Sequence, residues 1–277
     1  MVRLLLAVDG VAVNQALGNG STPLYEASAC GHGDVVRLLL SAEGVCVNQP
    51  RGDGCTPLYI ASEEGHGDVV GALLAADGVD VNKAQEDGCT PLFIASQGGH
   101  VDVVRELLAV EGVGINLATG KGSTPLYMAS GKGHGDVVRL LLSADGVEVN
   151  QATGTGATPL HIASQKGHGD VVRLLLAVDG VDVNRAKGDG STPLFVASEW
   201  GHGDVVRELL AAAGVGVNEA TGDGLTPLLI ASKEGHREVV RELAVAGVDR
   251  SIVFRGYTAL TIAKEEGHQA IVALLEE

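Results

Sequence analysis

The sequence predicts an all-α fold, a solenoid of stacked helix-turn-helix repeats with projecting turn loops. The tripeptide Thr-Pro-Leu begins at Thr22 and returns every 34 residues through Thr226, and the variant Thr258-Ala259-Leu260 begins an eighth copy 32 residues later. The pairs Gly-His and Val-Asn recur in step with it. A fixed period of this length is typical of repeat proteins, in which each unit packs only against its neighbours.

The first helix of each repeat is predicted from its capping residues, as the copy that begins at Thr22 illustrates. Thr22 is a good N-cap, and Pro23 occupies the first helical position, where its missing N–H costs nothing. Leu24 and Ala27 continue a helix of about two turns. Gly31 suits the left-handed conformation that ends a helix.

The second helix of the same repeat begins near Asp34, whose carboxylate favours the N-terminal end of the helix dipole. Arg37 follows three residues later, a spacing that allows a surface ion pair. The helical period gathers an apolar stripe from Val35, Val36, Leu39 and Leu40. Residues 45–55 have no helical period and predict an extended turn between repeats. Neither helix can bury its stripe alone, so the repeats must stack.

The repeats are predicted to fill residues 15–277 as eight stacked units of one solenoid domain. Residues 1–14 supply only the end of a second helix and its turn, so we expect a partial repeat there. Residues 2–10 recur unchanged at 172–180, which indicates a structural segment and not a signal peptide. We expect a monomer that can associate end to end through the incomplete repeat.

Composition excludes several classes of protein. A net charge of -16 argues against nucleic acid, which needs clustered Lys and Arg. No apolar stretch is long enough to span a membrane. The cysteines do not form a disulfide scaffold, because Cys55 and Cys89 occupy equivalent places in adjacent repeats, beyond the roughly 7 Å limit for a disulfide. We therefore expect a reducing, cytoplasmic compartment.

No catalytic, cofactor or metal site is expected. Eight of the nine histidines recur once per repeat, too far apart to share a Zn²⁺. Each is predicted to satisfy backbone groups at the start of its second helix. Residues 120–123 spell Gly-Lys-Gly-Ser, but the equivalent turn glycines recur elsewhere without Lys, so a phosphate loop is not indicated.

The recurring pattern resembles the ankyrin repeat. The match comprises Thr-Pro-Leu, then Tyr, Phe or His, then a variable residue and Ala, followed by Gly-His, Val-Val, a Leu run and Val-Asn, over eight repeats. The period is one residue longer than the usual 33 of that family, and the family's His after Thr-Pro-Leu survives only as His161. The resemblance implies a helix-turn-helix solenoid that binds partner proteins through its turn tips and the exposed ends of its first helices.

The positions that change between repeats are therefore the candidates for binding an unidentified partner protein. Trp200, the only Trp, stands after Glu199 at a first-helix end where other repeats carry small or polar residues, and exposed Trp is a typical hot spot. Large residues also replace small ones at the last two tips. The predicted partner-binding residues are Trp200, Glu199, Leu225, Phe254, Arg255, Tyr257, Lys166 and Lys132.

Other interpretations stay open. In one of them, Phe254 and Tyr257 merely cover the core of the last repeat and bind no partner. Single large apolar residues such as Trp200 also occur on ordinary surfaces. An engineered or consensus-like binding scaffold would also have repeats this alike, although Cys30, Cys46 and Pro50 look like natural drift, which favours a natural origin. In the resembled family an asparaginyl hydroxylase modifies the Asn of the Val-Asn turn. The candidates for hydroxylation are Asn48, Asn82, Asn116, Asn150, Asn184 and Asn218.

Overall fold

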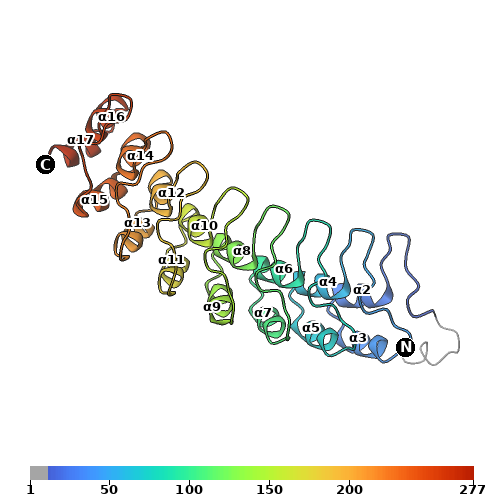
Figure 1. The fold of residues 1–277 in the computed structure, drawn as a ribbon. Helices are drawn as coiled ribbons and strands as arrows, with labels where there is room; N and C mark the ends of the chain where they lie inside the picture. The colour runs from blue at the N-terminus through green and yellow to red at the C-terminus, as the bar shows by residue number, and fades with distance from the viewer. Residues whose placement is uncertain (1–11) are drawn as a thin grey trace. The chain divides into compact units, whose positions relative to one another are not determined.

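The computed structural model describes residues 12–277 and confirms the all-α repeat fold. In this part of the chain sixteen helices, α2 to α17, alternate as the first and second helix of each repeat, and a loop projects before every first helix (Figure 1). The predicted partial repeat over residues 1–14 falls mostly outside the described residues. That residues 15–277 form one domain stays a prediction.

The first helices carry even numbers and begin directly after the recurring Thr. They are α2 (Pro23–Ala29), α4 (Pro57–Glu63), α6 (Pro91–Gly98), α8 (Pro125–Lys132), α10 (Pro159–Lys166), α12 (Pro193–Glu199), α14 (Pro227–Glu234) and α16 (Ala259–Glu265). The second helices begin directly after the recurring His. They are α3 (Gly33–Leu40), α5 (Gly67–Leu74), α7 (Val101–Leu108), α9 (Gly135–Ser143), α11 (Gly169–Leu176), α13 (Gly203–Leu210), α15 (Arg237–Val245) and α17 (Gln269–Glu276).

The helices group into two compact units, one of residues up to 129 with 139–147, the other of 130–138 with 148–277. Within the second unit, the first helices α10, α12, α14 and α16 pack in series, and so do the second helices α11, α13, α15 and α17. Within the first unit, α2, α4 and α6 form one series and α3, α5 and α7 the other. Each unit is therefore a double row of helices in which neighbours in space are neighbours in the repeat order.

The predicted caps set the helix starts. In α12 the Thr192 hydroxyl accepts a hydrogen bond from the Phe195 N–H at 3.2 Å, and Pro193 occupies the first helical position. Ser198, in the last turn of the same helix, is buried, and its Oγ donates a hydrogen bond to the Leu194 carbonyl one turn earlier, at 2.7 Å. In α12 both helix ends and the buried hydroxyl therefore have partners. The equivalent hydroxyls of Ser130, Ser164 and Ser232 are buried without a partner among residues 12–277.

The core lies between the two rows. In the second helix α13, Val205, Val206 and Leu209 are fully buried. Leu194 and Ala197 of the first helix α12, which packs against α13, are buried as well. Burying a Val or Leu side chain contributes about 1.5–3 kcal/mol, so the repeated stripe is the main stabilising contribution of each unit. No helix of residues 12–277 has both the length and the apolar character needed to cross a bilayer.

The loops before the first helices are hairpin-like turns that touch their neighbours. In one such tip loop the Arg51 N–H donates to the Cys55 carbonyl and the Gly54 N–H to the Arg51 carbonyl, both at 2.9 Å. The Gly52 N–H reaches the Asn19 carbonyl of the preceding tip at 3.1 Å, and Gly222 repeats this contact in the second unit. The tips thus form a ladder of backbone hydrogen bonds with little strand structure.

Candidate binding surface

The recurring histidines join consecutive repeats, and the prediction that they satisfy the start of their own second helix is wrong. His236 precedes α15, yet its ring makes no cap hydrogen bond there. Instead its Nε2 donates to the Glu199 carbonyl of the preceding repeat at 2.9 Å. The ring also lies against Gly201, whose φ of 77° suits glycine and where a Cβ would stand 2.6 Å from His236 Nδ1. Each Gly-His pair therefore takes part in two contacts between repeats. Its histidine bonds the preceding repeat, and its glycine lies against the histidine of the next repeat.

The recurring asparagines also join consecutive repeats, because each bonds the turn of the next repeat. The Asn184 amide donates to the Gly214 carbonyl and accepts from the Gly216 N–H, both at 2.7 Å. Its equivalents Asn48, Asn82 and Asn150 make both bonds as well. The amide of the Val-Asn turn is thus part of the frame. That these asparagines are hydroxylated stays a prediction.

His161, the histidine outside the recurring pattern, is a buried link between two repeats. Its Nδ1 accepts from the Thr158 N–H at 3.2 Å, and its Nε2 donates to the Ser191 carbonyl at 3.1 Å. These roles require the neutral ring with its proton on Nε2. Burial lowers the pKa of His161 to about 4. The ring therefore stays neutral at pH 7, and nothing in its surroundings suggests a reacting group.

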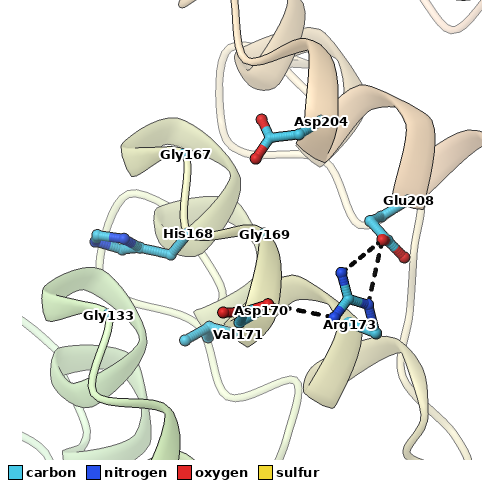
Figure 2. Close-up of a pocket in the computed structure, with 9 residues that line it drawn as sticks. All are labelled: Gly133, Gly167, His168, Gly169, Asp170, Val171, Arg173, Asp204 and Glu208. Atoms are coloured by element: carbon cyan, nitrogen blue, oxygen red, sulfur yellow. Dashed lines mark hydrogen bonds and ion pairs between the residues drawn. The ribbon is translucent and has the colours of Figure 1, made fainter.

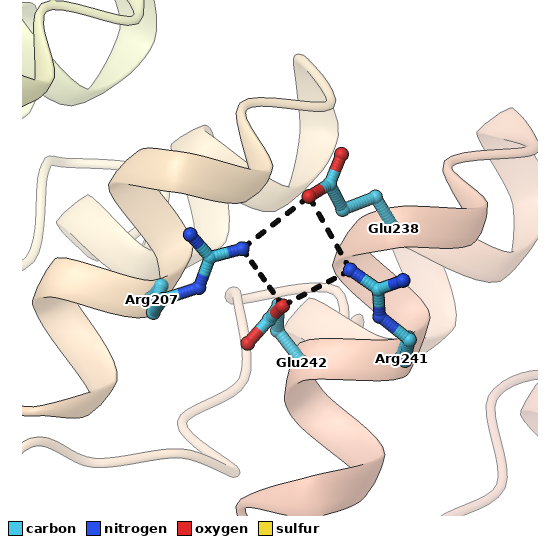
Figure 3. A network of polar contacts seen from close by, with 4 residues as sticks. All are labelled: Arg207, Glu238, Arg241 and Glu242. Carbon is cyan, nitrogen blue, oxygen red and sulfur yellow. Dashed lines mark hydrogen bonds and ion pairs between the residues drawn. The ribbon is translucent and has the colours of Figure 1, made fainter.

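Charges on the second helices are paired with one another. The Arg207 guanidinium bonds Glu242 at 2.9 Å and Glu238 at 3.3 Å, and Arg241 bonds the same two carboxylates (Figure 3). Arg207 follows Asp204 at the same three-residue spacing as Arg37 follows Asp34, a spacing that predicts an ion pair within one helix, but the ion pairs of Arg207 are with acids of the next repeat. These arginines hold the pKa of Glu242 below its ordinary value.

A polar hollow of about 300 Å³ lies between the starts of α11 and α13 (Figure 2). The cation that lines it, Arg173, bonds Asp170 at 3.2 Å and Glu208 at 2.9 Å. Asp204 lines the hollow as well, so the lining carries more negative than positive charge. None of the predicted partner-binding residues lines it. Among residues 12–277 no three His, Cys, Asp or Glu side chains gather as a metal site would require.

The predicted residues at the first-helix ends are on the surface. Trp200 caps α12 through its backbone N–H, which donates to the Val196 carbonyl at 3.1 Å. The residue itself is 54% exposed. Glu199, Lys166 and Lys132 are exposed at the same end of their own first helices. The structure therefore brings these four residues to one edge of the first-helix row.

The predicted tip residues lie at the other end of the first helices, where the loops enter them. Leu225 is half-buried against Phe195, Val196 and Ile230, so it belongs partly to the core. Leu225 does not lie beside Trp200, because Leu225 comes before the start of α14 whereas Trp200 stands at the end of α12. The predicted residues thus form two edges of the first-helix row and not a single cluster.

The last tip is a tight hairpin. Phe254 and Tyr257 exchange two backbone hydrogen bonds of 2.9 Å across Arg255 and Gly256, both of which have positive φ. Positive φ at both central residues is the type I′ geometry. The Arg255 guanidinium lies 5.0 Å from the Phe254 ring centre, and Tyr257 is 41% exposed. Phe254 is half-buried, which agrees in part with the interpretation that it covers the core of the last repeat.

One contact of the first unit was not anticipated. Arg51, on a tip, lies with its guanidinium 4.8 Å from the centre of the Tyr25 ring of the preceding repeat and pairs with Asp53. Burial raises the pKa of Tyr25 to about 12. A sequence signal existed, since Arg51 occupies a tip position where the preceding repeat has Leu17 and the next has Gln85.

Comparison with known families agrees with this architecture. A family model of ankyrin repeats in three copies matches residues 1–85, 78–153, 145–221 and 208–277. No curated protein matches the sequence. Because the four matches follow one another through the whole sequence, the chain belongs to the ankyrin repeat family.

Proposed function

We propose that this chain binds a partner protein through the exposed first-helix ends of residues 130–277, with the tip loops as a second edge, and that it carries out no catalysis. Ankyrin repeats are generally protein–protein interaction modules. The observation that carries the proposal is Trp200. Its side chain is exposed, and the frame uses only its backbone.

The recurring residues hold the frame, whereas several of the changing residues at the first-helix ends have no role in it. Histidine rings and asparagine amides bond the adjacent repeat, and arginines of the second helices bond neighbouring acids. By contrast, Lys132, Lys166 and Glu199 carry exposed charges, and no ion pair of theirs is present in residues 12–277. Side chains that stabilise nothing within the chain are the ones that a partner can recognise.

Tryptophan is suited to anchor such a contact. Its large flat ring loses little conformational entropy on binding and buries much apolar area, which is why Trp is enriched among hot spots. The acid Glu199 beside it and the lysines one and two repeats away provide a polar rim. Arg255 and Tyr257 offer the corresponding surface on the tip edge.

The test is affinity capture with three forms of the chain on a matrix, from a lysate of the source cells. We expect a protein that is retained by the wild type and by Arg207→Ala but lost by Trp200→Ala, with an affinity lower by at least about 30-fold, the hot-spot scale. Arg207 is the matched control because it lies on the second helices, away from the proposed surface. Identical retention by all three forms would contradict the proposal, and so would retention of no protein above a blank matrix.

A further inference from the structure

Five residues at the ends of consecutive first helices form a row with a defined order of charge. They are Lys132 at the end of α8, Lys166 at the end of α10, Trp200 at the end of α12, Glu234 at the end of α14 and Glu266 at the end of α16. We call them the end row. All are exposed and belong to the second compact unit. The order is basic, basic, aromatic, acidic, acidic.

The charges of the end row are not neutralised as those of the second helices are. No ion pair of Lys132, Lys166 or Glu266 is found within residues 12–277, and Glu234 pairs only with the adjacent Lys233, at 3.0 Å. On the second helices, by comparison, arginines such as Arg207 meet acids of the next repeat. The end row therefore keeps two unpaired cations on one side of Trp200, and acids on the other.

We propose, building on the function proposed above, that the end row binds an extended segment of a partner chain that carries acidic, apolar and basic residues in this order. The carboxylates of the segment lie against Lys132 and Lys166, its apolar residue lies on Trp200, and its cations lie against Glu234 and Glu266. Complementary charge chiefly sets which partner binds and in what register, while the buried aromatic contact supplies most of the affinity.

The spacing of the end row fits an extended chain. Helices that pack together lie about 8–10 Å apart, so residues of the end row recur at about that interval. A polyproline II segment rises about 3.1 Å per residue with three residues per turn. Every third side chain then points the same way at intervals of about 9 Å. Such a segment loses little entropy on binding, and an aromatic side chain is a good platform for it.

The probes are two capped synthetic peptides of equal composition and zero net charge. The block peptide is Glu-Pro-Pro-Glu-Pro-Pro-Leu-Pro-Pro-Lys-Pro-Pro-Lys, and the alternating peptide exchanges the second Glu with the first Lys. Emission of Trp200 reports binding at the proposed place, because the chain has one Trp. Titrations are made in about 0.05 M salt, where exposed charges are screened least.

The matched protein variant exchanges two charges, Lys166→Glu with Glu234→Lys, which leaves the net charge unchanged. The wild type should bind the block peptide about 5- to 10-fold more tightly than the alternating one, since two attractive pairs become two repulsive pairs. The exchanged variant has the order basic, acidic, aromatic, basic, acidic and should show the opposite preference by a similar factor. Both proteins should have the same urea midpoint, because these residues are exposed.

Three outcomes would overturn the inference. These are equal binding of both peptides by the wild type, a wild-type preference kept by the exchanged variant, and no change in Trp200 emission with either peptide up to about 1 mM, a concentration typical of very weak binding. The capture experiment is independent of these titrations. If capture depends on Trp200 and any of these three outcomes is also observed, the proposed function stands and only the charge order of the end row is refuted.

Discussion

Gly71 interrupts a ladder of arginines on the second helices, and restoring the arginine should stabilise the chain. The equivalent position is Arg in the other second helices from α3 to α15. In α11 and α13 that Arg bonds an acid of the next repeat, as Arg173 does with Glu208 at 2.9 Å. The acid opposite Gly71 is Glu106, and a Cβ on Gly71 would lie 3.7 Å from Glu106 Oε2, an ordinary contact. The substitution Gly71→Arg therefore fits.

Two contributions set the magnitude. Gly in the interior of a helix costs about 0.8–1 kcal/mol relative to Ala, and Arg is nearly as favourable as Ala. An exposed ion pair adds about 0.2–1 kcal/mol. We expect Gly71→Arg to raise the free energy of unfolding by about 1–2 kcal/mol, measured by urea denaturation with far-UV circular dichroism. The control Gly71→Ala should give only the first contribution, about 1 kcal/mol.

Salt and a second substitution separate the two contributions. The difference between Gly71→Arg and Gly71→Ala should shrink in about 1 M salt, which screens exposed pairs, and should vanish when Glu106→Gln is added. If Gly71→Arg is no more stable than Gly71→Ala at low salt, the ladder geometry does not extend to α5. If it is less stable than the wild type, the account of Gly71 as a simple interruption fails.

Three further predictions follow from other contacts. Because the folded pKa of His161 is about 4, below the ordinary 6.5, its contribution to stability is complete above pH 6.5 and falls by about 3 kcal/mol as the pH drops to 4. The difference in unfolding free energy between wild type and His161→Phe should change by that amount. A difference that is independent of pH would refute this prediction. Deletion of residues 251–277 should lower the urea midpoint markedly, since it uncovers α14 and α15, and an unchanged midpoint would show that α16 and α17 are not docked. Neither a chelator nor ATP should shift the melting temperature, and a stabilisation above about 1 kcal/mol would indicate a specific site.

The helices and their starts were predictable from the sequence because their causes are local. Thr192 and Pro193 fix the start of α12 within a few residues. Gly201, which follows the end of that helix, adopts the left-handed conformation that glycine favours. The period then supplies the stacking, since equivalent helices must pack on one another. Exposure of Trp200 followed from its replacing small and polar residues at equivalent positions.

Contacts between repeats were not predictable in the same way. His236 bonds Glu199, 37 residues earlier, and Arg207 bonds Glu242, 35 residues later. Both depend on how far one repeat is rotated and shifted against the next, which no local preference specifies. The half-burial of Leu225 has the same origin, because its tip folds back on the preceding first helix.

Two neighbours in the loop between α12 and α13 have different roles: the recurring His202 holds the frame, whereas the changing Trp200 is exposed and is proposed to bind. His202 donates from Nε2 to the Gln165 carbonyl at 3.0 Å, whereas the Trp200 ring is exposed. In urea unfolding followed by circular dichroism, His202→Ala should lose about 1–3 kcal/mol through a broken inter-repeat bond. Trp200→Ala should stay within about 0.5 kcal/mol of the wild type. A loss of several kcal/mol for Trp200→Ala, with His202→Ala near the wild type, would contradict the account.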